Sequence, residues 1–346
     1  MDLRDDYRLP AEWEPQAATF LAWPHRLATW PGHFDPIPGV YATVARAIAR
    51  HQPVRIVAGG RALADAKRHL EGTSNLSFLE VFTSDGWIRD SGPVFLLPRS
   101  GRPLRPVAVC WPFNAWGGKY PPWDLDAAVS GRIAASESLP IIRPDMVLEG
   151  GAIETDGEGT LLVNERCVVD PRRNPGLTRA DAERMLRDLL GVDSVLWLDG
   201  MLAGDDTDGH IDQIARFTAP GRVVAARQPD AGDPNHADLE ANLQRLVGMR
   251  DARGRRLEVI PIDIPPRFER HGVQLPASHL NFLVTNGSVL VPVFGGATDA
   301  AALRTLADCF PGRSIEPVDC RDLVWGRGAI HCITRDEPAW NVAEAR

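Results

Sequence analysis

Long apolar runs are missing from this sequence. No stretch approaches the roughly 18 consecutive apolar residues that a membrane-spanning helix requires. Residues 1–16 are charged and contain no apolar core of a signal peptide. We therefore expect a soluble protein that makes no contact with membranes.

Cysteine is scarce and unpatterned. The five cysteines are odd in number and far apart, which argues against a disulfide framework: Cys110, Cys167, Cys309, Cys320 and Cys332. Free thiols are typical of a reducing compartment, so we expect a cytoplasmic protein whose thiols are available for chemistry.

The sequence also lacks a basic patch and the common cofactor motifs. The formal net charge is −8, and Lys and Arg are spread singly along the chain, so no nucleic-acid partner is expected. An acidic balance suits a small cationic substrate. No GxGxxG motif opens a helix after a strand, and no GxxxxGK[ST], HExxH or paired CxxC motif is present.

The hydrophobic pattern predicts an α/β fold. With 346 residues, of which 44% are hydrophobic, the chain can build a large core, and without a linker we expect a single domain over 1–346. Helical spacing appears at 40–51, 124–139, 178–191, 234–249 and 299–310. Strand-like runs occupy 18–23, 53–59, 76–82, 93–98, 104–111, 160–170, 195–199, 211–217, 222–227, 257–263, 280–286 and 288–294. The repeating unit is therefore β-β-α-β.

Five segments combine turn glycines with charged or aromatic residues at element boundaries. They are DGWIRDSGP (85–93), FNAWGGKYPPW (113–123), LEGGAIETDGEGT (148–160), DDTDGHID (205–212) and GRGAIHCIT (326–334). Glycines in such turns permit a close approach of the backbone to a ligand. These segments are the candidates for a functional site.

Cys332 follows a small-residue turn, and three readings of it stay open: a core thiol, a metal ligand or a nucleophile. The adjacent His331 would point to the opposite face of an extended chain, so we expect it to serve structure. His210 is the better partner, and Asp212 would share its face if 210–212 is extended. The alternating acids of 205–212 also permit a metal site, although the EF-hand pattern fails there.

Three carboxylates, Asp90, Glu149 and Asp212, lie in glycine-containing turns. Acids around a thiol would raise its pKa by repulsion between like charges, which is useful if the substrate brings a cation. A guanidinium pairs bidentately with carboxylates and could stack on Trp87. Taken singly, Asp90 could instead bond Arg89 or the turn backbone, and Glu149 could be a solvated loop end.

Together these segments resemble the agmatine deiminase family, which belongs to the guanidine-modifying pentein proteins. The resemblance runs from LPAEWEPQAATFLAWPH through WIRDSGP, FNAWGGKYPPWDLD, LEGGAIETDGEGTLL, NERCVVDPRRNP, DDTDGHIDQIARF and LNFLVTNGSVLVPVFG to GAIHCIT. It implies a five-bladed α/β propeller, an activity without metal or organic cofactor, and a homodimer. The implied reaction is hydrolysis of agmatine to N-carbamoylputrescine and ammonia.

The resemblance also implies roles for individual residues. Cys332 matches the nucleophile, and His210 matches the general acid and base. Asp90 and Asp212 are similar to the carboxylates that grip the guanidinium, and Glu149 would contact both the guanidinium and His210. Trp87 matches the aromatic residue beside the reacting group.

The sequence departs from the family pattern around this set. Family members often show Gly-Gly-Gly-Asn where this chain has Gly326-Arg327-Gly328-Ala329, and often Ser-Ile-His where it has 152–154 as Ala-Ile-Glu. These departures concern the tail of the substrate. Arg327 would suit the carboxylate of free or peptidyl arginine, whereas Trp116 would suit the amine tail of agmatine. An amidinotransferase, a metal hydrolase and a guanidine-binding protein without turnover are the remaining alternatives.

Overall fold

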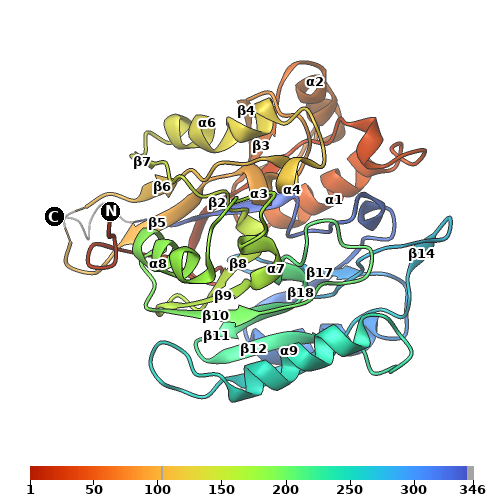
Figure 1. The fold of residues 1–346 in the computed structure, drawn as a ribbon. Coiled ribbons are helices and arrows are strands. Elements are labelled where there is room, and N and C mark those ends of the chain that lie inside the picture. The colour runs from red at the N-terminus through yellow and green to blue at the C-terminus, as the bar shows by residue number, and fades with distance from the viewer. Residues whose placement is uncertain (103, 341–346) are drawn as a thin grey trace.

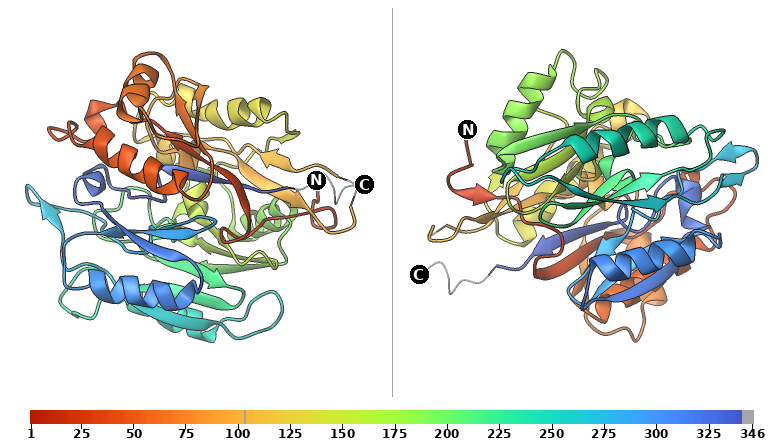
Figure 2. Two further views of the ribbon diagram at one scale, coloured as in Figure 1. Left: turned by 180° about the vertical axis from the view of Figure 1, so that it is seen from behind. Right: turned by 90° about the horizontal axis from the view of Figure 1, so that it is seen from below.

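The computed structural model of the chain describes residues 1–102 and 104–340 and has an α/β fold (Figure 1). Its strands form small sheets of two to four strands, and the helices lie on the outer faces of the larger sheets (Figures 1 and 2). No helix in these two ranges is long and apolar enough to cross a membrane.

A β-β-α-β unit recurs along the chain, as the sequence predicts. In each unit two antiparallel strands are followed by a helix and a third strand that runs parallel to the second. One unit consists of β8 (Ile153–Thr155), β9 (Thr160–Asn164), α8 (Arg179–Leu190) and β10 (Ser194–Leu198). The next consists of β11 (Ala215–Ala219), β12 (Arg222–Arg227), α9 (His236–Gly248) and β13 (Glu258–Asp263). Another consists of β16 (Leu283–Val284), β17 (Ser288–Val293), α10 (Asp299–Cys309) and β18 (Ser314–Asp319).

Two further sheets have the same pattern with additions. One contains β1 (Tyr7–Arg8), β5 (Val94–Pro98), β6 (Val107–Val109) and β7 (Ile141–Ile142), with α6 (Val129–Ser136) leading into the last strand. The other contains β2 (Gln16–Ala22), β3 (Val54–Ala58), β4 (Leu76–Glu80) and β19 (Thr334–Pro338). The helices α1 (Ile37–Ala49) and α2 (Gly60–His69) connect β2 to β3 and β3 to β4. Because β19 pairs antiparallel with β2, the last strand lies beside an early one (Figure 2).

Several element boundaries differ from those expected. The strand predicted at 160–170 ends at Asn164, whose side chain accepts a hydrogen bond from the Arg166 amide and so begins α7 (Glu165–Val168). The helix predicted at 124–139 is divided into α5 (Asp124–Ala127) and α6. The strand predicted at 280–286 is reduced to the two residues of β16. The helix expected at 178–191 is confirmed as α8 (Arg179–Leu190), and Thr178 caps it, since its hydroxyl accepts from the Asp181 amide at 3.1 Å.

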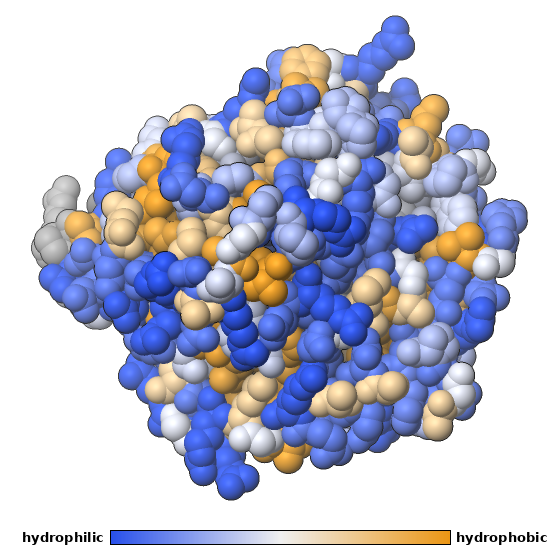
Figure 3. Space-filling view, viewed as in Figure 1, coloured by the Kyte–Doolittle hydropathy of each residue, from blue (hydrophilic) through white to orange (hydrophobic). Residues whose placement is uncertain are grey.

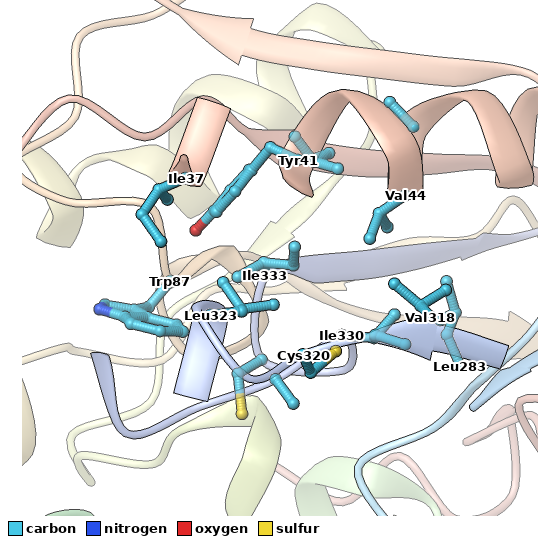
Figure 4. Packing of buried hydrophobic residues seen from close by; sticks show 14 of the residues in the cluster. Ile37, Tyr41, Val44, Trp87, Leu283, Val318, Cys320, Leu323, Ile330 and Ile333 are labelled. Carbon is cyan, nitrogen blue, oxygen red and sulfur yellow. The ribbon is translucent and has the colours of Figure 1, made fainter. Parts of the chain in front are cut away.

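The largest apolar cluster packs α1 against the C-terminal segment that leads into β19. Figure 4 shows Tyr41 and Val44 of α1 above Ile330 and Ile333, with Trp87 beside them. This cluster extends to Cys332 itself, so the candidate nucleophile is anchored at the edge of a dry core. On the face shown in Figure 3, hydrophilic residues dominate and hydrophobic ones gather in separate small groups.

Candidate active site

A cavity of about 390 Å³ lies at the edge of this core. Its volume is in the range of small-molecule binding sites. The lining residues that matter below are Asp85, Trp87, Asp90, Trp116, Tyr120, Asp206, Arg327, Gly328 and Cys332. The cavity therefore collects residues from four of the five segments singled out in the sequence.

Short turns and helices place the five candidate catalytic residues. Asp90 lies in the single-turn helix α3 (Ile88–Ser91), and Glu149 directly precedes the 3-10 turn η2 (Gly150–Ala152). His210 precedes the 3-10 turn η3 (Ile211–Gln213), which contains Asp212, and Cys332 lies in the turn before β19. All five side chains are buried, with at most 6% of the residue exposed.

The thiol of Cys332 is held between an amide and a carboxylate. Asn281 Nδ2 lies 3.2 Å from its Sγ, and Asp212 Oδ2 lies 3.8 Å from it. Burial raises the pKa of the Cys332 thiol well above its usual value, and the charges of Asp212 and Asp90 add to this effect. The rise expected from the surrounding acids is therefore confirmed, although burial is its main cause.

Asn281 was not anticipated. Its side-chain oxygen accepts from the amide of Ala329 at 3.2 Å, so one amide group fixes both the turn and the sulfur. The available signal was a lone asparagine inside the apolar run LNFLV (280–284), where a buried polar side chain needs partners.

His210 lies between two acids. Its Nδ1 is 3.7 Å from Asp90 Oδ1, and its Nε2 is 3.8 Å from Glu149 Oε2. Burial opposes the imidazolium charge, but Asp90, Glu149 and Asp212 outweigh it and raise the pKa of His210 to about 9. Within the described residues, neither ring nitrogen has a hydrogen-bond partner. The ring is therefore protonated near neutral pH and free to donate.

Asp212 does not pair with His210 in the way the sequence suggested. The strand predicted at 211–217 is wrong at its start, because residues 211–213 form η3 and β11 begins at Ala215. Gly209, at φ +93°, and the turn that follows send the Asp212 side chain to His331, whose Nδ1 lies 2.8 Å from Oδ2. Asp212 Oδ1 is buried and has no hydrogen-bond partner among the described residues.

Asp90 is oriented by two donors. The Gly151 amide donates to its Oδ1 and the Trp116 indole to its Oδ2, each at 2.9 Å. The alternative contact with Arg89 is wrong, because Arg89 donates to the His331 carbonyl oxygen and to Asp336. Burial raises the pKa of Asp90, and this effect exceeds the lowering by His210.

Glu149 is not a solvated loop end, since 1% of it is exposed. Arg173 Nε donates to its Oε1 at 2.8 Å. Burial alone would raise the pKa of Glu149, but Arg173 and His210 hold it below its usual value. Arg173 was missed as a supporting residue, although it lies in the quoted segment NERCVVDPRRNP, where a second arginine among turn residues was a weak signal.

The glycine pair after Glu149 allows the catalytic side chains to converge. A Cβ on Gly151 would lie 2.6 Å from His210 Nδ1, 2.8 Å from Asp90 Oδ1 and 3.2 Å from Asp212 Oδ2. A Cβ on Gly150 would lie 2.1 Å from the Arg89 carbonyl oxygen. The close approach expected at these glycines is therefore made by protein side chains and backbone.

Two tryptophans line the cavity beside the thiol. The ring of Trp87 packs on Trp30, with centroids 5.5 Å apart, and a Cβ on Gly328 would lie 2.6 Å from the Trp87 ring. Trp116, which the sequence suggested for the substrate tail, uses its indole N–H to hold Asp90. It packs edge-on against Tyr120.

The cavity wall also carries charges of both signs. Arg327, at φ +71°, donates to the Gly204 carbonyl oxygen at 3.0 Å, and its Nε lies 3.8 Å from Asp206 Oδ2. The hydroxyl of Tyr120 donates to Asp206, whose pKa rises to about 6, chiefly through burial. Asp85 adds a second carboxylate on the cavity wall.

The alternating acids of 205–212 are directed to different partners. Asp208 pairs with Lys119 at 2.6 Å and with Arg172 and Arg173 at 2.8 Å. In residues 1–102 and 104–340, no group of three or more His, Cys, Asp and Glu side chains is arranged to hold a metal ion.

This arrangement favours chemistry on a cation. A buried thiol, an imidazolium and three carboxylates lie close together, and one carboxylate oxygen and two ring nitrogens lack partners in the described part of the chain. A buried unpaired acceptor is costly unless a donor arrives. A planar ligand with several N–H donors and a delocalised positive charge would satisfy the Asp212 oxygen and balance the charge of the three carboxylates.

Comparison with known proteins places this site in a family. The family model described as Porphyromonas-type peptidyl-arginine deiminase matches residues 8–338. An agmatine deiminase from Stutzerimonas stutzeri is 38% identical over 359 aligned positions, which cover 97% of this chain and 96% of that protein.

Solved structures agree with this placement. An Enterococcus faecalis agmatine deiminase structure superposes with a TM-score of 0.92 at 34% identity and covers 97% of both chains. A C. jejuni agmatine deiminase with substrate bound superposes with a TM-score of 0.88 at 26% identity and covers 96% of both chains. By fold, length and sequence, the chain is a hydrolase of the same class as these agmatine deiminases. It therefore belongs to the Porphyromonas-type peptidyl-arginine deiminase family.

Proposed function

We propose that this protein hydrolyses agmatine to N-carbamoylputrescine and ammonia through a covalent intermediate on Cys332. One observation carries the proposal. Next to the thiol, Asp212 Oδ1 and both ring nitrogens of His210 are buried without hydrogen-bond partners in the described residues. A guanidinium has five N–H donors in a planar fork and would supply a hydrogen bond to the Asp212 oxygen, whereas the N–H groups of the protonated His210 stay available to donate. The names of the curated and solved relatives support the choice of agmatine.

In this proposal Asp90 and Asp212 grip the guanidinium, one from each side. Asp90 is fixed by the Gly151 amide and the Trp116 indole, and Asp212 is fixed by His331. Trp87 lies under the guanidinium plane, where a cation gains from the aromatic face. Glu149 orients His210 and contacts the guanidinium nitrogen that leaves.

The substrate itself activates the nucleophile. In the free site the pKa of Cys332 is raised by burial and by Asp212 and Asp90, so the sulfur carries its proton. A guanidinium bound between these acids cancels their charge and favours the thiolate, and the thiol proton leaves to solvent. The thiolate then attacks the central carbon, which forms a C–S bond and a neutral tetrahedral adduct.

His210 supports both halves of the reaction. Its imidazolium donates a proton to one amino group of the adduct, the C–N bond breaks, and ammonia leaves an amidino-thioether cation on Cys332. The neutral His210 then takes a proton from water as the water oxygen attacks the same carbon. Collapse of this second adduct breaks the C–S bond, and its hydroxyl proton passes to the departing sulfur. The neutral ureido product and the Cys332 thiol are thereby released, with His210 again an imidazolium.

A second substrate, free arginine, is favoured by one specific observation. Arg327 lines the cavity, and its guanidinium could meet the carboxylate of an amino acid. Its charge, however, already faces Asp206 at 3.8 Å, and Asp85 adds a further acid. This balance favours an amine tail, so agmatine is the leading substrate.

The same proposal includes the architecture. Five sheets with the β-β-α-β order, the last completed by the pairing of β19 with β2, support a five-bladed α/β propeller in one domain over 1–346. The homodimer and the cytoplasmic location stay predictions.

The test is ammonia release from agmatine, free arginine and a peptide ending in arginine, with chelator present and no amine acceptor. Turnover of agmatine above the others, lost in Cys332→Ala, is the expected result. A preference for arginine would make arginine the substrate in place of agmatine and would leave the mechanism unchanged. Activity that requires an added amine acceptor would identify an amidinotransferase instead of a hydrolase. No ammonia release from any of the three substrates by folded protein would contradict the proposal.

A further inference from the structure

His331 lies between two carboxylates. Its Nδ1 is 2.8 Å from Asp212 Oδ2, and its Nε2 is 2.7 Å from Glu12 Oε2. His331 is 2% exposed. Both ring nitrogens are therefore occupied by protein acceptors, and neither is free to take a proton from water or substrate. This contact excludes His331 as the general base and leaves a supporting role.

The two carboxylates are themselves held as anions. The Val284 amide donates to Glu12 Oε1 at 2.8 Å, and Arg216 lies 3.2 Å from the same oxygen. Burial acts to raise the pKa of Glu12, but Arg216, His331 and Arg89 hold it below its usual range. His331, His210 and Arg216 likewise outweigh burial at Asp212 and lower its pKa.

A neutral imidazole has one N–H and one bare nitrogen. If the ring of His331 were neutral, one of the two anionic oxygens would face a lone pair at hydrogen-bond distance. Two ionised acceptors therefore require both ring nitrogens to carry hydrogen. The geometry describes an imidazolium that donates once to Glu12 and once to Asp212.

We infer that His331 is a positioning residue: as an imidazolium bound to Glu12, it holds Asp212 ionised and turned so that Oδ1 is free for the guanidinium. The inference rests on the proposed function, because Asp212, which His331 positions, is one of the two carboxylates that bind the guanidinium there. It adds a link of three residues, Glu12 partly buried and His331 and Asp212 buried, that joins the N-terminal segment, η3 and the turn before β19.

Other charged groups surround this link. A small hollow of about 40 Å³ lies on the Glu12 side of His331. The titratable and charged groups that face the link are Arg89 of α3, Glu154 of β8, Arg216 of β11, Arg335 and Asp336 of β19, and His210, Asp90 and Cys332 of the active site. Arg216 donates to Glu154 at 2.7 Å and to the Leu280 and Phe282 carbonyl oxygens, so its charge is fixed in place beside Glu12.

The inference predicts a change in pH dependence when the cation is removed. In His331→Gln, the side chain can donate to Asp212 but carries no charge, so the pKa of Asp212 should rise. The acidic limb of kcat/KM for agmatine should then move to higher pH, by about one pH unit. KM should rise more than kcat falls, because Asp212 grips the guanidinium before and during the reaction. Glu12→Gln should shift the limb in the same direction by less.

A matched control is His279→Gln. His279 is another buried histidine with both ring nitrogens bonded, to the Pro292 carbonyl oxygen and to Thr298, and it lies outside the cavity. Its substitution should lower Tm without moving the acidic limb. If His331→Gln behaves like His279→Gln, with an unmoved limb or a uniform loss of kcat at every pH, the inference is overturned and His331 is merely structural.

A measurement on the wild-type protein tests the same inference without a variant that could fail to fold. In the wild type with ¹⁵N-labelled histidine, His331 should show two ring N–H signals under the conditions of the agmatine assay, one for each carboxylate that the ring contacts. One ring N–H signal under those conditions would overturn the inference. Wild-type turnover of agmatine keeps the two questions separate, since its absence would count against the proposed function and leave the NMR result to judge His331.

Discussion

The Sγ atom of Cys332 lies 3.8 Å from Asp212 Oδ2, so the candidate nucleophile is placed beside a buried anion. This neighbour works against the thiolate, because burial, Asp212 and Asp90 all raise the pKa of the thiol. The arrangement becomes productive when a cation lies between them. The resting protein should therefore have an unreactive thiol, and binding of the guanidinium should activate it.

Asp212→Asn separates these two effects. Removal of the negative charge should lower the thiol pKa and speed alkylation of Cys332 by iodoacetamide about tenfold near neutral pH. The same substitution should reduce kcat/KM for agmatine about 100- to 1000-fold, since one grip on the cation is lost. Asp308→Asn, at an exposed aspartate of α10, should change neither. Slower alkylation together with lost turnover would contradict this account of the thiol.

The pH profile should report the charge of His210. Its pKa is raised to about 9, so the imidazolium is present below that pH and is lost as the pH rises through it. Because the imidazolium supplies the proton for the departing ammonia, kcat/KM should fall above about pH 9. A basic limb between about pH 6 and about pH 7 would mean that His210 is neutral in the free enzyme, against the effect of Asp90 and Glu149.

Gly151→Ala should disable the site without unfolding the chain. The new Cβ would lie 2.6 Å from His210 Nδ1 and 2.8 Å from Asp90 Oδ1, and displacement of catalytic groups by about 1 Å costs about 100-fold in rate. Circular dichroism and Tm should stay close to the wild type. The matched control is Gly248→Ala at the exposed end of α9, where nothing lies within 4 Å of the new Cβ. Full activity of Gly151→Ala would show that the three side chains need not converge there.

Substitution of Arg327 should change the preference between the amine tail of agmatine and the carboxylate of free arginine. Because its guanidinium faces Asp206 at 3.8 Å, Arg327→Gln should free this acid for an amine and raise kcat/KM for agmatine several-fold. The same change should lower any activity toward free arginine. Both rates are measured by ammonia release under one set of conditions. Loss of agmatine turnover in Arg327→Gln would mean that Arg327 positions the substrate in some other way.

The sequence predicted the β-β-α-β order because periodicity is local, and it failed where a side chain ends an element. At Asn164, a cap turns a strand-like run into a helix, and at Gly209 a left-handed glycine turns the expected strand into η3. Such endings depend on a single hydrogen bond or dihedral angle, which an apolar pattern does not record.

The sequence predicted the main residues of the candidate site but not the contacts that support them. The resemblance pointed to Cys332, His210, Asp90, Asp212 and Glu149, and the structure brings all five together. Their supports were not predictable, because contacts such as Asn281 to Cys332 or His331 to Asp212 join segments 51 and 119 residues apart. Only the folded chain shows that Asp212 is bound to His331 and leaves Oδ1 without a partner in the described residues.

The most direct test of the central claim is rapid-quench mass spectrometry of the wild type mixed with agmatine. The account predicts a transient adduct on the Cys332 peptide, with the mass of agmatine less ammonia, that forms with a burst of ammonia and decays to N-carbamoylputrescine. Cys332→Ala should show neither adduct nor burst. Steady production of N-carbamoylputrescine by Cys332→Ala at the wild-type rate would contradict the account.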